Sequence, residues 1–213
     1  MLPPDQQMFE YQDNDLKETL PKIKSQIFLG VSIVDLQALT LLNLVYAKDS
    51  YYQQIKKKTL VIGTSLFPEE AFNKYFANFE ENKLEHLNFD IFLAVQKSGY
   101  KIFTGSEDGQ RVLDQFGYKD YKHIEFAGPI REEGADKNML EIKDAMQNHH
   151  QSKIWNDLGK RCMQCGKCTI ACPVCFCFRM YDQAGLKQGS GHRSRCWDSC
   201  FYNEFTQVAG ASP

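Results

Sequence analysis

One run of cysteines carries the clearest chemical signal in this chain. It reads Cys162-Met-Gln-Cys165-Gly-Lys-Cys168-Thr-Ile-Ala-Cys172, and Pro173 follows at once. Two CxxC steps, a fourth cysteine after three more residues and a proline form the spacing that holds [4Fe–4S] clusters. The short intervals let the backbone wrap closely around a cubane, so that three thiolates reach three irons. The run therefore predicts an iron–sulfur site with these four cysteines as its ligands.

The fourth ligand of this cluster has several candidates, because four more cysteines follow the run. They are Cys175, Cys177, Cys196 and Cys200. In proteins with two clusters, the fourth cysteine of each run ligates the other cluster. Since this chain carries one such run, Cys172 or any of the later four could complete the first cluster. We expect one [4Fe–4S] cluster in this chain, and a second only if the chain is a fragment.

Zinc sites and disulfides also use paired cysteines. A structural zinc site usually draws on two well-separated pairs, whereas these cysteines crowd into one loop. A disulfide framework suits a small secreted domain, but the first 161 residues contain no cysteine. Iron–sulfur ligation is therefore favoured. A zinc-stabilised interaction module, or a redox sensor whose cluster is lost on oxidation, is the alternative.

The 213 residues divide into a cysteine-free body and a cysteine-rich tail. The net charge of −2 provides no basic field that would attract nucleic acid or anionic lipid. No apolar run approaches the roughly 20 residues of a membrane span, and the N-terminus lacks the features of a signal peptide. We expect a cytoplasmic protein without a nucleic-acid partner or a membrane span.

The body alternates strand-like and helix-like segments, which predicts an α/β or α+β domain with a mixed sheet. Strands are expected at residues 22–34, 59–67, 89–95 and 100–104, the last two as a hairpin. Asp35 is expected to cap a helix that ends near Lys48, and Asp49 a second helix. Ser106 is expected to cap a third helix, which Gly117 ends.

A further helix is predicted from Pro68, because two glutamates follow this proline in the first turn. Its aromatic stripe, Phe72, Tyr75, Phe76 and Phe79, is typical of core packing rather than of a cofactor platform. The body contains no glycine-rich phosphate-binding run and no catalytic constellation at a diagnostic spacing. We therefore expect neither nucleotide binding nor catalytic residues.

The organisation expected from this pattern has three parts. Residues 1–129 form the α/β scaffold, residues 130–160 a helical connector, and residues 161–213 a mostly helical, ferredoxin-like cluster-binding segment. Within the last part, the spacing of four between Cys196 and Cys200 predicts that they share one face of a helix. Arg193 and Arg195 could offset the negative charge of a thiolate-ligated cluster, or lie on the surface.

The tail resembles a known family. Residues 161–210 are similar to the iron–sulfur β subunit of sulfhydrogenase-type NiFe hydrogenases, and equally to the A subunit of anaerobic sulfite reductases. The motifs that carry the resemblance are the cysteine run, extended through Cys177, and Arg195-Cys-Trp-Asp-Ser-Cys-Phe201. The resemblance implies a subunit that relays electrons between a flavin-containing NAD(P)H-linked subunit and a hydrogenase or sulfite reductase catalytic subunit. It implies no catalysis by the chain itself.

This chain departs from the family pattern at its end. Members of the family continue past the equivalent of Ala209-Gly210 into a second run of the same cysteine spacing, whereas this chain stops at Pro213. We therefore expect it to be either a fragment or a shortened relative that lacks the second cluster motif.

Overall fold

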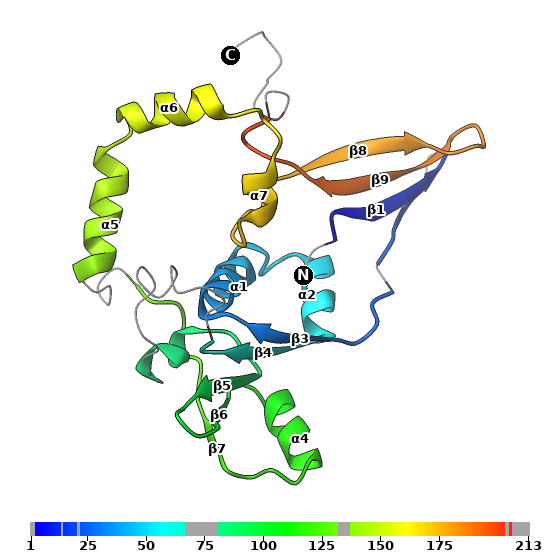
Figure 1. Cartoon of the computed structure of the whole chain (residues 1–213). Helices are drawn as coiled ribbons and strands as arrows, with labels where there is room; N and C mark the ends of the chain where they lie inside the picture. Colours follow the sequence, from blue (N-terminus) through cyan, green and yellow to red (C-terminus); the bar gives the residue numbers. More distant parts are fainter. Residues whose placement is uncertain are drawn as a thin grey trace.

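The computed structural model describes residues 3–13, 15–20, 22–66, 81–131, 137–202 and 205. These residues form two sheets with helices beside them (Figure 1). The first sheet is antiparallel, in the order β2-β1-β9-β8, and consists of β1 (Asp5–Gln12), β2 (Asp15–Glu18), β8 (Phe178–Ala184) and β9 (Ser190–Trp197). The second follows the order β3-β4-β5-β6-β7, with β3 (Gln26–Val31), β4 (Thr59–Thr64), β5 (Ile91–Val95), β6 (Tyr100–Thr104) and β7 (Tyr121–His123).

The helices fall into a group beside the second sheet and a group that leads to the cysteines. The first group is α1 (Ile33–Val45), α2 (Ser50–Lys57), the 3-10 helix η1 (Glu81–His86) and α4 (Glu107–Gln115). The second is α5 (Lys137–Asn148), α6 (Lys153–Arg161) and α7 (Lys167–Ala171). The helices predicted for the connector are thus present as α5 and α6. Neither of them has a buried residue, and both stand apart from the sheets (Figure 1).

The mixed sheet predicted for the body is confirmed. Strands β3, β4 and β5 run parallel, β5 and β6 form the predicted antiparallel hairpin, and β7 is parallel to β6. The core lies where α1 and η1 cover this sheet, with Leu36, Phe92 and Phe103 fully buried. Gly63 in β4 permits this packing, because a Cβ there would lie 2.7 Å from Leu36 Cδ1 and 2.8 Å from Phe92 Cδ2.

Two of the three predicted helix caps are confirmed, and one is corrected. Ser32, and not Asp35, caps α1: its hydroxyl accepts a hydrogen bond from the Asp35 N–H at 3.2 Å and donates one to the Asp35 carboxylate at 2.7 Å. Asp35 occupies the third helical position, where an acid reinforces a serine cap. The predicted caps Asp49 and Ser106 are confirmed, and Gly117, at φ 71°, follows α4. The helix predicted from Pro68 lies outside the described residues.

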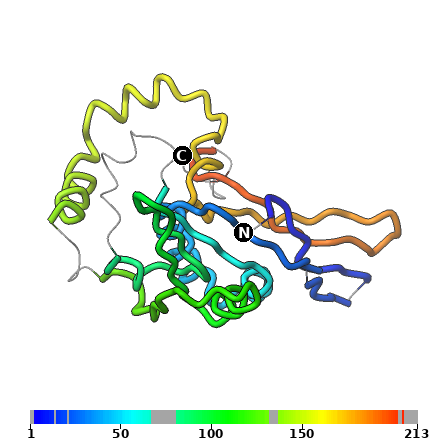
Figure 2. Tube along the Cα trace, turned by 60° about the horizontal axis from the view of Figure 1, so that its bottom comes forward, coloured from blue at the N-terminus to red at the C-terminus, as the bar shows by residue number. Residues whose placement is uncertain are grey.

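The tail folds differently from the expectation. After Cys177 it forms the hairpin β8–β9, whose second strand includes Cys196, for which a helix was predicted. Cys196 lies in β9 and Cys200 in the turn after it, so the prediction that they share a helix face was wrong. The strand β9 is paired on both sides: it runs antiparallel to β8 and also to β1, with Asp5 opposite Cys196, so that the two ends of the described chain share one sheet (Figure 2).

A buried ion pair joins this sheet to the body. Arg195 Nη1 donates to Asp49 Oδ2 at 2.5 Å and Nη2 donates to Gln6 Oε1 at 2.9 Å, so one side chain links β9, the cap of α2 and β1. The Arg195 and Asp49 side chains are 7% and 18% exposed. The guanidinium also lies over the rings of Tyr46 and Phe178, at 5.8 Å and 5.4 Å from their centroids.

Replacing this arginine should destabilise the protein, because Arg195→Met leaves the Asp49 carboxylate buried without its counter-charge. We expect a loss of about 3 kcal/mol in the free energy of unfolding, measured by urea denaturation. Arg193→Met is the matched control, since Arg193 lies two residues away in β9 but pairs with Asp182 in solvent, with its side chain 52% exposed. Equal unfolding midpoints for the two variants would contradict the prediction.

Candidate functional site

The cysteine run lies in the loop between α6 and α7 and in α7 itself. Cys162 ends α6, Cys168 lies in the first turn of α7, and Cys172 follows its last residue. Two left-handed residues turn the loop between them: Gln164 at φ 53° and Gly166 at φ 70°. The thiols of all four cysteines of the run are exposed. The sequence and the fold therefore agree that these sulfurs share one compact, accessible segment.

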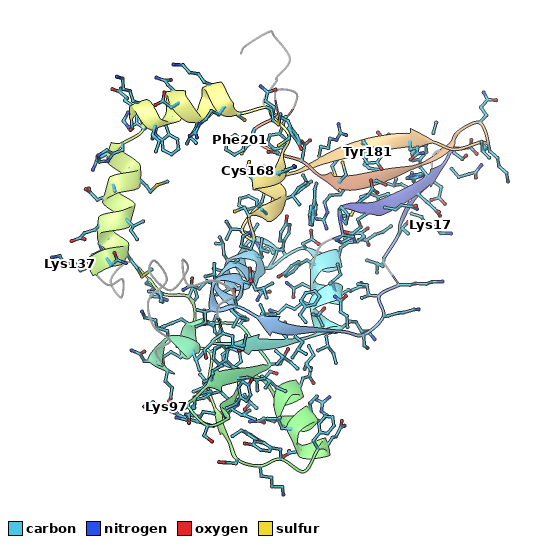
Figure 3. The ribbon with its side chains drawn as sticks, viewed as in Figure 1. Lys17, Lys97, Lys137, Cys168, Tyr181 and Phe201 are labelled. Atoms are coloured by element: carbon cyan, nitrogen blue, oxygen red, sulfur yellow. The ribbon has the colours of Figure 1, made fainter. Side chains whose placement is uncertain are left out.

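The turn after β9 packs against this loop. The Thr169 and Ser199 hydroxyls are 2.6 Å apart, and Ser199 is fully buried. The Tyr202 hydroxyl occupies the space where a Cβ on Gly166 would lie, 1.8 Å from that position. These two contacts flank Cys200 in the sequence and hold its turn against the run, as the positions of Cys168 and Phe201 also show (Figure 3). The turn that carries Cys200 is thereby held against the loop of the run.

Cys175 and Cys177 occupy a second position, on the side of the run that faces the body. The Cys175 N–H donates to the Cys172 carbonyl at 3.2 Å, and the Asp198 N–H donates to the Cys177 carbonyl at 3.1 Å. Burial raises the pKa of the Cys177 thiol, the adjacent Cys175 thiol raises it further, and a hydrogen bond from the Cys200 backbone lowers it. Cys177 thus interacts with both Cys175 and Cys200.

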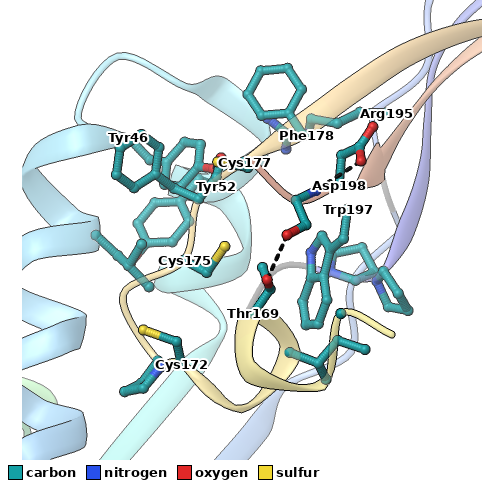
Figure 4. A pocket seen from close by; sticks show the side chains of 18 of the residues that line it. Tyr46, Tyr52, Thr169, Cys172, Cys175, Cys177, Phe178, Arg195, Trp197 and Asp198 are labelled. Atoms are coloured by element: carbon teal, nitrogen blue, oxygen red, sulfur yellow. Dashed lines mark hydrogen bonds between the residues drawn. The ribbon is translucent and has the colours of Figure 1, made fainter. Parts of the chain in front are cut away.

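A cavity of about 540 Å³ separates this segment from α1 and α2 (Figure 4). Three thiols line it, those of Cys172, Cys175 and Cys177, together with apolar and aromatic side chains of the body and the Arg195 guanidinium. The Tyr46 hydroxyl closes one side by donating to the Phe176 carbonyl at 3.1 Å. Burial raises the pKa of Tyr46, so this hydroxyl stays protonated and keeps its role as a donor.

Cys196 lies apart from the other thiols. Its sulfur accepts a hydrogen bond from Arg179 Nε at 3.3 Å. Side chains alternate across a strand, so Cys196 projects from the face of β9 opposite to its neighbours Arg195 and Trp197, which line the cavity. Of the two arginines that the sequence offered as counter-charges, Arg195 lies at the cysteines, whereas Arg193 pairs with Asp182.

The donor set fits an iron–sulfur cluster in its chemistry. All eight cysteines are free thiols, and thiolates are the ligands that such clusters use. As the side chains lie, no three Cys, His, Asp or Glu residues among those described stand close enough to hold a metal ion. Ligation therefore requires the thiols to turn about their Cα–Cβ bonds, which the exposed positions of the run allow. None of the described helices has the length and apolar character needed to cross a bilayer.

Comparisons with known proteins agree with this assignment. Residues 161–213 match the family model of the 4Fe-4S dicluster domain. Over 95% of its length the chain is 28% identical to sulfhydrogenase 2 subunit beta of Pyrococcus furiosus, which confirms the resemblance expected from the motifs. The chain spans 63% of the length of that relative. No solved structure matches the chain.

The close packing at Gly166 gives a test of the loop geometry. Gly166→Ala should lower the iron bound per chain by half or more, because the added methyl overlaps the Tyr202 ring and hydroxyl, so that the turn after β9 has to move away from the loop. Gly117→Ala is the matched control: its φ of 71° imposes the same backbone strain, but no atom lies within 4 Å of the new Cβ. Iron analysis of anaerobically purified proteins measures the effect, and equal iron in both variants would refute it.

Proposed function

We propose that this chain, a distant homologue of a sulfhydrogenase β subunit, is a non-catalytic electron-transfer subunit of an oxidoreductase complex. The observation that carries the proposal is the four-cysteine run on the α6–α7 loop, within the segment that matches the 4Fe-4S dicluster domain. Bound there, a [4Fe–4S] cluster supplies one-electron redox chemistry.

The cluster ligands in this proposal are Cys162, Cys165 and Cys168, with Cys200 as the fourth. Cys200 is favoured over Cys172 because its turn is fixed to the loop by the Thr169–Ser199 hydrogen bond and by Tyr202. Cys172 instead lines the cavity toward the body. The chain's own residues thus bring the loop of the run and the turn after β9 together, and the exposed thiols can turn toward a common centre.

The proposed partners are inferred from the similar protein and from the sequence of this chain. Sulfhydrogenase 2 subunit beta is, by its name, one subunit of a larger enzyme. We propose a flavin-containing NAD(P)H-linked subunit as electron donor or acceptor on one side, and a catalytic subunit of hydrogenase or sulfite reductase type on the other. The sequence contains no glycine-rich phosphate-binding run, so contact with NAD(P)H belongs to the flavin subunit. We place this complex in the cytoplasm, where thiolates stay reduced.

The cluster itself is tested by metal analysis. Anaerobically purified protein should contain at least four iron and four sulfide per chain and show broad visible absorption that dithionite bleaches. Cys162→Ser/Cys165→Ser should lose about four iron atoms, whereas Cys196→Ser, on the outer face of β9, should keep them all. A colourless protein with stoichiometric zinc would refute the proposal in favour of a zinc-stabilised module.

The relay role is tested by the choice of reductant. The protein alone should be reduced by dithionite but not by NADH or NADPH over several minutes, because in this proposal the flavin subunit accepts the hydride. Addition of an NAD(P)H-linked flavin subunit should restore bleaching of the cluster absorption by NAD(P)H. Direct reduction of the isolated chain by NAD(P)H would contradict the division of roles. If air changes only partner binding, without affecting electron flux, the chain is a redox sensor.

A further inference from the structure

Positive charge is concentrated in the helix and loop that lead into the cysteine run. Residues 152–172, the basic segment, contain four cations and one carboxylate, so this segment carries a charge of +3, whereas the whole chain carries −2. The cations are Lys153 and Lys160 of α6, Arg161 at its end and Lys167 at the start of α7. All four residues are exposed, and within the described part of the chain none of them forms an ion pair with a carboxylate.

Helix stability explains only two of these four charges. Lys160 and Arg161 lie in the last turn of α6, where the helix dipole favours cations. Lys153 and Lys167 are instead the first residues of α6 and α7, where the dipole favours carboxylates, and neither helix has an acidic residue in its first turn. Because neither its helix nor an ion pair accounts for these two lysines, their charge is available to a partner.

The basic segment also presents thiols and apolar side chains to solvent. The thiols of Cys162, Cys165 and Cys168 are exposed, so a cluster that they hold reaches the surface. Met163 is 82% exposed in the same loop, and Ile170 of α7 is 66% exposed. No residue of α6 is buried, and this helix stands apart from both sheets (Figure 1). Another protein therefore has free access to the segment.

The composition of the basic segment indicates what kind of partner it fits. Permanent subunit interfaces are large and apolar, and lysine is depleted from them. Transient encounters between redox proteins bury less than about 1,200 Å², and complementary charges on the two surfaces accelerate their association. Four solvated cations beside exposed thiols therefore favour a transient partner with an acidic face over a permanently bound subunit.

We propose that the basic segment is the docking site of a small electron-carrier protein with an acidic face. The proposal rests on the proposed function and adds a route for electrons that does not pass through the flavin subunit. The cations attract carboxylates of the carrier, while Met163 and Ile170 contact apolar residues around its redox centre. When the carrier is a reduced flavoprotein, its flavin loses one electron and the cluster gains it, so that no atom is transferred.

Binding is measured first under conditions in which no electron moves. Oxidised flavodoxin, a small acidic flavoprotein, is titrated calorimetrically into the anaerobically purified full chain at low salt. Lys153→Glu/Lys167→Glu should raise the Kd about tenfold, because repulsion replaces attraction at two positions. Both substitutions place an acid in the first turn of a helix, which favours the fold. Lys153→Arg/Lys167→Arg keeps the charge and should bind like the unmodified chain.

The matched control moves the same amount of charge elsewhere. Lys97→Glu/Lys119→Glu alters two exposed residues in the loops after β5 and α4, and Figure 3 shows Lys97 well separated from Cys168. Its Kd for flavodoxin should change less than about twofold, because salt screens charges that lie beyond a Debye length. An equal loss of affinity in this control would show that only the net charge matters and would overturn the docking site.

Electron transfer gives a second measurement. The rate constant for reduction of the cluster by fully reduced flavodoxin, followed by stopped-flow absorbance, should fall about tenfold between about 0.01 M and about 1 M salt. In Lys153→Glu/Lys167→Glu it should be low and insensitive to salt. Oxidation of the reduced chain by cytochrome c, a basic protein, should respond in the opposite sense and be faster in this variant.

The outcomes separate this inference from the proposed function. An unchanged Kd and rate constant in Lys153→Glu/Lys167→Glu, with a cluster that dithionite still bleaches, would overturn the docking site alone. An unmodified chain without cluster absorption would overturn the proposed function. Salt-dependent binding of phosphatidylserine vesicles or single-stranded DNA, without binding of flavodoxin, would assign the basic segment to another class of partner and would overturn the docking of a carrier protein.

Discussion

The arrangement of the whole site depends on one buried cation. Burial of the Arg195 guanidinium costs free energy unless its charge and its N–H donors find partners. The partners come from three distant parts of the chain: Asp49 at the cap of α2, Gln6 in β1 and the faces of two aromatic rings. The hairpin can dock on the body only in the register that satisfies this charge. Cys172, Cys175 and Cys177, which precede the hairpin, then line the cavity beside α1.

Because side chains alternate along β9, neighbouring residues of this strand lie in different surroundings. Arg195 and Trp197 point toward the cavity, whereas Cys196, between them in the strand, points to the opposite face. A helix would have brought Cys196 and Cys200 to one face and would have made Cys196 a natural ligand. In the strand, Cys196 instead lies beside Arg179, and Cys200 lies in the turn that follows. Because residues 190–197 form a strand and not a helix, Cys196 and Cys200 do not share one face.

The sequence predicted the features that depend on neighbouring residues. The cysteine run, the caps Asp49 and Ser106, the β5–β6 hairpin and the mixed sheet all follow from local spacing and composition. The sequence did not predict the features that depend on contacts between distant segments. The polar stretch that forms β9 lies between β8 and β1, and its pairing with β1, nearly the whole chain away, cannot be read from the local sequence. The cavity that Cys172, Cys175 and Cys177 line was missed for the same reason, since α1 forms its other side.

The pairing of β1 with β9 also orders events in time. A chain that leaves the ribosome N-terminus first exposes β1 long before its partner has been made, and domains fold as their parts become available. The mixed sheet has all its strands by β7 and can form early, while contacts of such large sequence separation are slow to close. The platform that carries the cysteines is therefore complete only when synthesis has passed residue 197. Delivery of iron and sulfide is thus a late step of biogenesis, directed at a body that is already folded.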